Sequence, residues 1–242
     1  MQKTNWIPAP EPFNVLIHQV DIWRISLDLM PDSVKLFEST LSADEAERAA
    51  RFHFEVDKNR FIVAHGALRN ILSRYLQNNS AELTFSLNQY GKPTLVNSTL
   101  EFNLSHSGEF ALVAVTQGRK VGVDVERIRQ GISSHVIAQQ YFSKAEVAEL
   151  QSLPLEQRES AFFICWTRKE AYIKAQGLGL SLPLESFDVS LTPGHPAILR
   201  ATRPDPKESA RWRFLSLDVD LNYAGAIAVE NDTLDFRFFS YH

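Results

Sequence analysis

Hydrophobic residues along the chain recur at helical spacing in some stretches and at strand spacing in others. The helical spacing is clearest over residues 57–76, where one face carries the apolar side chains Phe61, Ala64, Leu68, Leu72 and Leu76. Residues 158–176 predict a second long helix. Gly177 and Gly179 would end it, because glycine accepts the left-handed backbone of a helix cap. We therefore expect one long helix in each half of the chain.

Two shorter helices carry start signals. Ser42 is followed three residues later by Glu45, and Ser143 is followed by Glu146 at the same spacing. A serine N-cap and a glutamate in the first turn satisfy two backbone donors reciprocally, which is a capping box. We expect the first of these helices to reach about residue 54, and we expect a further helix near residues 133–140.

Short apolar or alternating runs predict strands in both halves, at residues 15–27, 83–87, 101–104, 110–115 and 120–126 and in the tail from residue 187. Residues 1–14 contain three prolines and are expected to form an extended arm. Each half then contains a capped helix, a long helix and short strands, with residues 60–76 corresponding to 158–174. We predict an α+β fold of two similar lobes, residues 1–118 and 119–242, with ligands bound between them.

Composition narrows the class of protein. Of 242 residues, 44% are hydrophobic and 22% are charged, as in an ordinary globular protein. The net charge of −4 argues against a nucleic-acid-binding protein. Cys165 is the only cysteine, so neither an internal disulfide nor a cysteine metal site is expected. Without a signal peptide or an apolar run long enough for a bilayer, we expect a cytoplasmic protein with no membrane partner.

Residues 121–126 alternate between valine and other residues. On a strand, the valines face one side, and Gly122, Asp124 and Glu126 face the other. The two carboxylates would stand about 6–7 Å apart, and like charges so close repel unless a cation lies between them. Oxygen ligands suit Mg²⁺, and Gly122 would leave room for a ligand. The alternative is an edge strand with a solvated polar face.

Another polar pair lies on the long helix of the second half. Glu170 and Lys174 are four residues apart and share a helix face. The simplest interpretation is a surface ion pair, which contributes little stability. Trp166 and Ile173 make that face partly apolar, however, and a carboxylate buried there would need a partner. Glu170 is therefore a candidate third metal ligand, and Lys174 is a candidate phosphate-binding residue.

Three more motifs could contact an anion. Ser105, His106 and Ser107 offer hydrogen-bond donors between two predicted strands, where a plain polar turn is the alternative. Lys92 lies on a rigid turn, although the following proline and a missing glycine exclude a P-loop. The first two helices carry several arginines, among them Arg48, for which a solvated helix face is the simplest interpretation. A serine hydrolase is not indicated, because adjacent residues on a strand point apart and no Gly-x-Ser-x-Gly motif is present.

Taken together, these motifs resemble those of the phosphopantetheinyl transferases of the surfactin-synthetase-activating (Sfp) type. The resemblance covers about residues 41–191. Its most specific blocks are Gly-x-Asp-x-Glu at residues 122–126 and Trp-x-x-Lys-Glu-Ala at residues 166–171, about 40 residues apart. The supporting blocks are Gly91–Pro93, Phe102–Ser107 and Phe142–Glu146.

The resemblance implies a pseudo-twofold monomer of two similar α+β lobes with coenzyme A between them. It implies that magnesium is held by Asp124, Glu126 and Glu170, and that Lys174 contacts the pyrophosphate. The positions that match the site of the adenine nucleotide and its 3′-phosphate are Arg48, Lys92, Ser105 and His106.

Two positions depart from the family pattern. Glu45 stands where some members carry a lysine near the 3′-phosphate, and Phe61 replaces a hydroxyl residue found in some relatives. Nucleotide affinity would then depend more on Arg48, Lys92 and His106.

The implied activity is transfer of the 4′-phosphopantetheine arm of coenzyme A to a serine of an apo acyl or peptidyl carrier protein, with release of 3′,5′-ADP. Glu170 is the expected acceptor of the serine proton. Such carriers serve fatty acid, polyketide or nonribosomal peptide synthesis. The alternatives are another magnesium-dependent phosphotransferase such as a nucleotide hydrolase, and a binding module with an inactive site. The ordered motifs disfavour the first, and the intact carboxylates and Lys174 disfavour the second.

Overall fold

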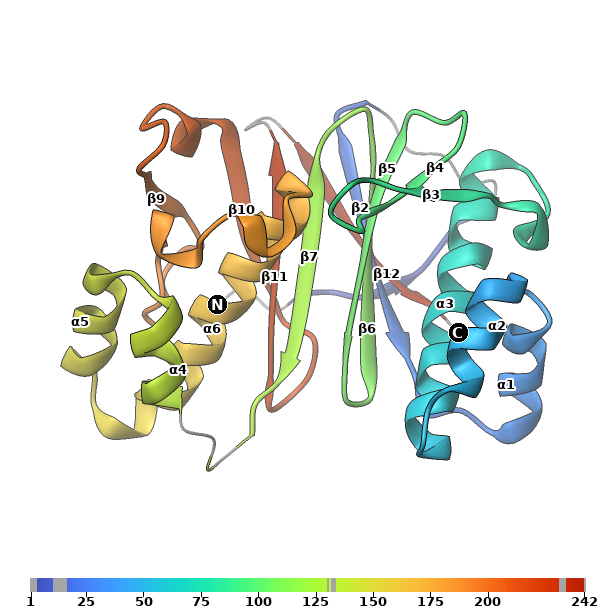
Figure 1. Ribbon diagram of the computed structural model, residues 1–242, viewed down its shortest axis with the longest axis horizontal. Coiled ribbons are helices and arrows are strands. Elements are labelled where there is room, and N and C mark those ends of the chain that lie inside the picture. The colour runs from blue at the N-terminus through green and yellow to red at the C-terminus, as the bar shows by residue number, and fades with distance from the viewer. Residues whose placement is uncertain (1–3, 11–16, 130, 132–133, 231–233, 242) are drawn as a thin grey trace.

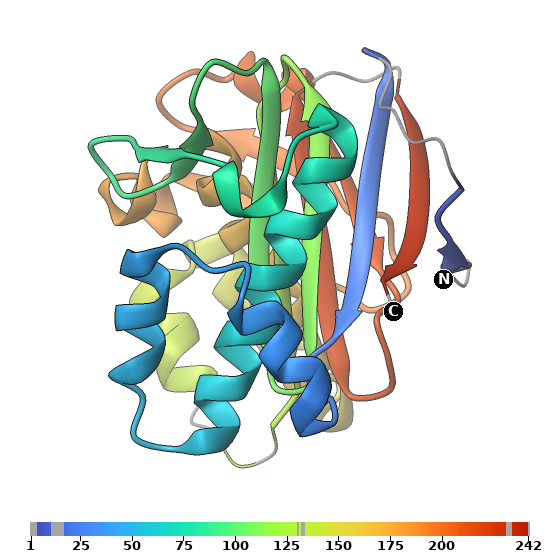
Figure 2. The ribbon, with the colours of Figure 1, turned by 90° about the vertical axis from the view of Figure 1, so that its right-hand side faces the viewer.

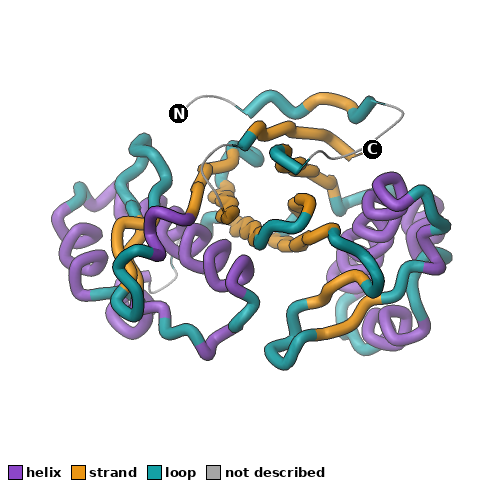
Figure 3. The backbone as a smooth tube through the Cα atoms, turned by 90° about the horizontal axis from the view of Figure 1, so that it is seen from above, coloured by secondary structure: helices purple, strands orange, loops and turns teal. Residues whose placement is uncertain are grey.

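The computed structural model describes residues 4–10, 17–129, 131, 134–230 and 234–241. Strands occupy the middle of the molecule, and helices lie on both sides of them (Figure 1). Viewed from above, the strands curve around a common centre with one group of helices at each flank (Figure 3). This mixture of helix and sheet confirms the prediction of an α+β protein. No helix in these ranges combines the length and apolarity needed to span a bilayer.

Five strands form the larger sheet, in the order β1-β12-β2-β6-β5. Their bounds are β1 (Ile7–Pro8), β2 (Gln19–Ser26), β5 (Leu100–Ser107), β6 (Phe110–Gln117) and β12 (Asp235–Tyr241). Strands β2, β6 and β5 are antiparallel neighbours, whereas β12 runs parallel to β2. Figure 2 shows β12 beside β2 with β1 beyond it. A 2.7 Å ion pair between Arg237 and the buried Asp21 fastens β12 to this sheet.

A smaller sheet has the order β10-β11-β7. Its strands are β7 (Val121–Arg127), β10 (Trp212–Leu217) and β11 (Tyr223–Glu230). Two short antiparallel pairs complete the strands, β3 (Phe85–Leu87) with β4 (Pro93–Leu95) and β8 (Phe187–Val189) with β9 (Leu199–Thr202). Strand β7 is an edge of the smaller sheet and lies against β5, which is an edge of the larger one.

The helices fall into two groups, on opposite sides of the strands in Figure 1. The described α-helices are α1 (Pro31–Glu38), α2 (Ala43–Ala50), α3 (Glu55–Leu76), α4 (Ser134–Tyr141), α5 (Lys144–Ser152) and α6 (Leu155–Gln176). Single turns of 3₁₀-helix occur at Ser80–Glu82, Gly179–Ser181, Leu184–Ser186 and Glu208–Arg211. Helices α3 and α6 have 22 residues each.

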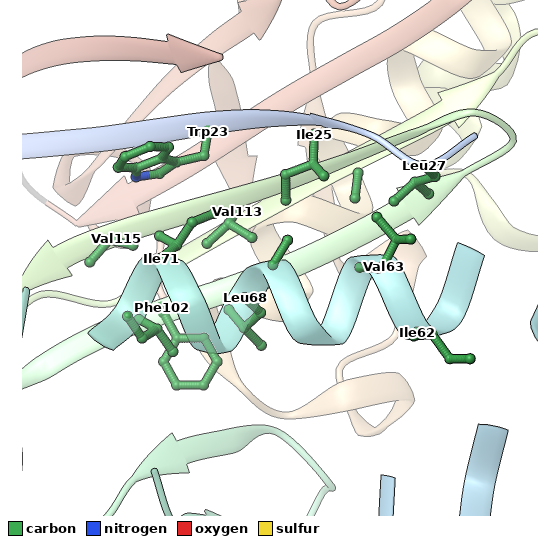
Figure 4. Close-up of a cluster of buried hydrophobic side chains, with 14 of the residues drawn as sticks. Trp23, Ile25, Leu27, Ile62, Val63, Leu68, Ile71, Phe102, Val113 and Val115 are labelled. Atoms are coloured by element: carbon green, nitrogen blue, oxygen red, sulfur yellow. The ribbon is translucent and has the colours of Figure 1, made fainter. Parts of the chain in front are cut away.

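Both faces of the larger sheet are buried. Trp23 and Ile25 of β2 point toward α3, where they pack with Val113, Leu68 and Ile71 (Figure 4). The alternate residues of β2, such as Val20 and Ile22, belong to a second apolar cluster that also contains the three valines of β7. Successive side chains of a strand point to opposite faces of the sheet, so β2 can pack against α3 on one face and against the smaller sheet on the other. The apolar layer between the sheets therefore fixes which side of β7 its polar residues face.

The predicted helix starts are confirmed, because both capping boxes are present with reciprocal side-chain and backbone hydrogen bonds. Gln77 and Gly177 end the long helices in the left-handed conformation. The first capped helix ends at Ala50 rather than near residue 54, and the next one already begins at Glu55. Residues 15–16, which begin the predicted first strand, and residue 133, which begins the helix expected near residues 133–140, lie outside the described residues, as do residues 1–3 and 11–14 of the expected arm.

One strand boundary matters for the site. Sequence placed residues 105–107 in a turn after a strand ending at Leu104, and this expectation was wrong. Strand β5 continues to Ser107 and pairs with β6 over its whole length. Polar residues that resembled a turn are therefore strand residues, and their side chains alternate between the two sides of β5.

Candidate functional site

The seam between β5 and β7 is joined by side chains instead of a backbone ladder. Alternate residues of β5 accept hydrogen bonds from backbone N–H groups of β7: Asn103 Oδ1 from Val123 at 2.8 Å, Ser105 Oγ from Val125 at 3.4 Å and Ser107 Oγ from Arg127 at 3.1 Å. Buried N–H groups need acceptors, and an edge strand such as β7 leaves one row without them. These three polar side chains supply acceptors and join the two sheets.

The same serines also contact the carboxylates of β7. Ser105 Oγ donates to Asp124 Oδ1 at 2.8 Å, and Ser107 Oγ donates to Glu126 Oε2 at 2.8 Å. Asp124 is buried, with only 3% of its surface exposed. The prediction that both carboxylates lie on the face opposite the buried valines is confirmed, but the alternative of a solvated polar face does not describe Asp124.

Helix α6 contributes Lys174 to this cluster. Its Nζ lies 2.6 Å from Asp124 Oδ1 and 2.9 Å from Ser105 Oγ. The ion pair is thus made with β7, and the simple surface pair with Glu170 on the same helix is not formed. Among the described residues, Glu170 makes no side-chain hydrogen bond or ion pair, and its carboxylate lies within electrostatic range of Asp124, Glu126 and Lys174.

Gly122 has a different purpose from the one expected. A Cβ atom at this position would lie 2.1 Å from Ala171 O and 2.3 Å from Ala175 N, both in the backbone of α6. The space beside Gly122 is therefore filled by helix α6, and the expectation that it leaves room for a ligand was wrong. The missing side chain lets α6 approach β7 closely, which brings Lys174 within reach of Asp124.

The electrostatics of the cluster favour a cation. Burial raises the pKa of Glu126 and of Glu170, and the charge of Asp124 raises both further. The buried Oδ2 of Asp124 has no hydrogen-bond partner. One buried and two half-buried carboxylates that repel one another, together with an orphaned carboxylate oxygen, fit the oxygen donor set of a hard divalent ion. As the side chains stand in the described residues, no three possible ligands converge tightly enough to form a metal cage.

His106 faces away from the carboxylates, toward α2 and α3. Burial, together with the positive charges of His65, Lys174 and Arg48, lowers the pKa of His106 to about 4. Arg48 lies over the ring of Phe61 at 5.3 Å, and His65 stacks on the same ring at 4.0 Å. Phe61 therefore serves as a platform for both Arg48 and His65. The structure brings His106 and Arg48 into one electropositive region, and sequence reasoning missed His65.

Lys92 lies elsewhere. Its Nζ donates to the carbonyls of Val121 at 3.1 Å and Ala175 at 3.4 Å, so it ties the start of β7 to the end of α6. Burial lowers its pKa. Lys92 lines a cavity of about 250 Å³ together with Glu170 and Lys174, while His106 lines a separate cavity of about 460 Å³. Each cavity is lined by residues from both sides of the β5–β7 seam, among them Asn103 and Lys174 in the smaller and His106 and Arg127 in the larger.

Glu45, the position that departs from the family pattern, is not a free surface charge. Its carboxylate accepts from the Ser42 backbone at 2.9 Å and from Arg69 Nε at 2.6 Å. Burial opposes ionisation, but the hydrogen bonds from His65, Ser42 and Arg69 hold the pKa of Glu45 at about 2. Glu45 therefore stabilises the junction of α2 and α3.

Glu146 has a related structural task in the second half. It completes the cap of Ser143, lies 2.8 Å from Lys169 Nζ and accepts from Val189 N at 2.8 Å. Only 1% of its surface is exposed. The sequence singled out Glu146 as a capping residue, and its buried partner Lys169 lies within the Trp-x-x-Lys-Glu-Ala block.

Fold and site together define an α+β protein in which a buried carboxylate cluster, with one lysine, lies at the seam of two sheets and near an electropositive surface. Sequence comparison identifies the family. A family model described as the 4′-phosphopantetheinyl transferase superfamily matches residues 120–228, and one described as 4′-phosphopantetheinyl transferase, N-terminal, matches residues 30–118. The chain belongs to the 4′-phosphopantetheinyl transferase superfamily, as its motifs predicted.

Curated relatives agree with the family models. The chain is 38% identical to the 4′-phosphopantetheinyl transferase HetI of Nostoc sp., over 100% of both chains. It is 36% identical to the transferase ffp and 33% identical to the transferase Sfp, both of Bacillus subtilis, over 70% of this chain and 76% of each relative. The predictions of an enzyme and of the Sfp type within this superfamily are confirmed.

Proposed function

We propose that this chain transfers the 4′-phosphopantetheine arm of coenzyme A to a serine hydroxyl of an apo carrier protein and releases 3′,5′-ADP. The observation that carries the proposal is the pairing of full-length similarity to a named transferase with a carboxylate and lysine cluster at the β5–β7 seam. Asp124 of β7 and Lys174 of α6, which both match family positions, meet in that cluster.

We further propose that residues 1–118 and 119–242 are two similar lobes related by a pseudo-twofold axis, with the active site between them. The two family models meet at residues 118 and 120, which supports this division. So do the equal lengths and left-handed C-caps of α3 and α6, and the capping boxes of α2 and α5. Glu45 with Arg69 and Glu146 with Lys169 are equivalent ion pairs in this scheme. Strand β12 is the exception, since it pairs with β2.

The proposed metal is magnesium, held by Asp124, Glu126 and Glu170. The orphaned Oδ2 of Asp124 and the mutual repulsion of the three carboxylates support this assignment. When bound, the ion would neutralise charge on the pyrophosphate of coenzyme A. Lys174 would supply a further positive charge to the same pyrophosphate, from a position already close to Asp124.

For the nucleotide, we propose that Arg48 and His106 bind the 3′-phosphate. Their proximity to one another and the stacking of Arg48 on Phe61 support a preformed anion site, because the arginine needs little reordering. Ser105 and Lys92 complete the proposed nucleotide contacts. Lys92 donates a hydrogen bond to Val121 O, and Ser105 donates one to Asp124. Their contribution to nucleotide binding would therefore include holding β7 and α6 in place.

The chemical step is a substitution at phosphorus. The oxygen of the carrier serine forms a bond to the β-phosphorus of coenzyme A, the bond from that phosphorus to the bridging oxygen breaks, and 3′,5′-ADP leaves with the electron pair. We propose that Glu170 takes the serine proton. Burial and the neighbouring charges of Asp124 and Glu126 raise the pKa of Glu170, and a base with a pKa nearer to neutrality is more effective at physiological pH.

The proposed partners are coenzyme A and an acyl or peptidyl carrier of fatty acid, polyketide or nonribosomal peptide synthesis. We propose that the enzyme acts as a monomer in the cytoplasm and binds no nucleic acid. Its net charge of −4 and the burial of its lone cysteine are compatible with these assignments.

Intact-mass spectrometry of several apo carriers after incubation with coenzyme A and Mg²⁺ tests the proposal. We expect one or more carriers to gain the mass of a single phosphopantetheine arm, with one 3′,5′-ADP formed per carrier. Release of inorganic phosphate without carrier modification would indicate a nucleotide hydrolase instead. Binding of coenzyme A with neither product would indicate a binding module.

A further inference from the structure

Ser107 belongs to a motif whose other two residues already have proposed roles. It lies at the end of β5, with 8% of its surface exposed, and faces β7 on the same side of the strand as Ser105. Its Oγ donates to Glu126 Oε2 at 2.8 Å and accepts from the backbone N–H of Arg127 at 3.1 Å. Among the described residues, no other side chain hydrogen bonds to Glu126.

The two contacts together orient the hydroxyl. A serine hydroxyl has a single proton and two acceptor lone pairs. Since the Arg127 N–H occupies a lone pair, the proton remains available for the carboxylate of Glu126. The acceptor and the donor partner are consecutive residues of β7, so the hydroxyl is fixed relative to the strand that carries the carboxylate. Glu126 is therefore held from the neighbouring sheet.

Glu126 needs such support more than Asp124 does. Asp124 Oδ1 has both Lys174 and Ser105 as partners, whereas Glu126 has the one hydroxyl. A hydrogen bond to a metal ligand fixes the orientation of that ligand, and among the described residues Ser107 alone donates one to Glu126.

We propose that Ser107 is a positioning residue that orients Glu126 as a ligand of the divalent cation. The inference rests on the proposed function, because it takes the carboxylates of β7 as a metal site. Ser107 acts through Glu126 and touches neither substrate nor reacting atoms in this scheme. Its removal should therefore weaken metal binding and raise the metal concentration needed for half-maximal rate, with a smaller change in the rate at saturating metal.

The direct test is titration of the full-length protein with Mn²⁺, followed by electron paramagnetic resonance of the free ion. Loss of a group that hydrogen bonds a metal ligand typically weakens metal affinity by about 10–100-fold. We expect a loss of this size for Ser107→Ala and near-wild-type affinity for Ser107→Thr, which keeps the hydroxyl. In a Glu126→Gln background, Ser107→Ala should add little, because the group through which it acts has been changed.

Asn103→Ala is the matched control. Asn103 makes the same kind of seam hydrogen bond, to Val123, without touching a carboxylate of β7. The Asn103→Ala variant should unfold at a lower urea concentration than wild type, much as Ser107→Ala does. Its affinity for Mn²⁺ should stay close to that of the wild type. Unchanged Mn²⁺ affinity in Ser107→Ala, or equal losses in both alanine variants, would overturn the inference.

The inference and the proposed function fail in different ways. If the wild type binds no Mn²⁺, the metal site and the role of Ser107 are both overturned. If the wild type binds Mn²⁺ and the Ser107 variants behave as expected, but no carrier is modified, the proposed function alone is refuted.

Discussion

Gly122→Ala tests whether the close contact between β7 and α6 is what assembles the site. The added Cβ would lie 2.1 Å from Ala171 O and 2.3 Å from Ala175 N. Favourable contacts between non-bonded carbon atoms lie at about 3.5–4.0 Å, so strand and helix must separate by roughly 1.4 Å to relieve the shorter contact. Both obstructing atoms belong to the helix backbone, which cannot swing aside as a flexible side chain could.

The expected cost follows from this geometry. Overpacking in a core usually costs about 1–3 kcal/mol and occasionally more, and a clash with helix backbone belongs at the upper end, at about 3 kcal/mol. The same separation would lengthen the 2.6 Å contact between Lys174 and Asp124. A misplacement of about 1 Å in an active site can lower the rate by roughly 10²-fold, so activity should fall even in the folded variant.

Urea unfolding measures the stability of Gly122→Ala, and initial rates of carrier modification at low temperature measure its activity. Gly118→Ala is the matched control. Gly118 has φ +63° with open space around its Cβ position, so its substitution should cost only the left-handed backbone penalty of about 1–2 kcal/mol. A Gly122→Ala protein within about 0.5 kcal/mol of wild type, the range of an ordinary surface substitution, with an unchanged rate, would refute the reasoning.

Three further predictions concern single side chains. Arg48→Ala should raise the KM for coenzyme A more than it lowers kcat, because the 3′-phosphate is remote from the reacting bond; equal KM values would contradict the assignment. The rate should rise with pH through the elevated pKa of Glu170, since a base must be deprotonated, and a pH–rate profile of Glu170→Gln should lack that limb. Glu45→Ala should lower the free energy of unfolding by about 3 kcal/mol, because Arg69 is left buried without its partner. As the pKa of Glu45 is about 2 against an ordinary 4.5, this stabilisation should be complete above pH 4.5 and lost as pH falls through 2, as acid unfolding of wild type and variant can measure.

Local patterns predicted the local structure well. Helical spacing, two capping boxes and the alternation of valine in residues 121–126 each depend on neighbours a few residues apart, and the structure contains all of them. The carboxylates of β7 were placed on the correct face for the same reason. Candidate residues could be proposed wherever spacing along a single element defines a shared face.

Contacts between residues of different helices and strands could not be predicted from such local patterns. The partner of Lys174 on α6 proved to be Asp124 on β7, and the space beside Gly122 proved to hold a helix. Both depend on how α6 packs on β7, which no periodicity along one element encodes. The parallel pairing of β12 with β2 is equally non-local. The sole sequence signal for the seam was the alternation of Asn103, Ser105 and Ser107, which became visible only once those residues were seen to lie on a strand.

The seam between β5 and β7 links stability to function through shared atoms. Strand β7 is an edge, so its buried N–H groups require acceptors that no neighbouring backbone supplies. Serine hydroxyls satisfy this need and still have a proton to donate, which an asparagine oxygen such as that of Asn103 lacks. Ser105 and Ser107 direct that proton to Asp124 and Glu126. The positions where hydroxyls join the sheets are therefore the positions where the carboxylates of β7 are held in place by hydrogen bonds. Replacing either serine with an apolar residue should weaken the joint and the carboxylate site together, whereas replacing Asn103 should weaken the joint alone.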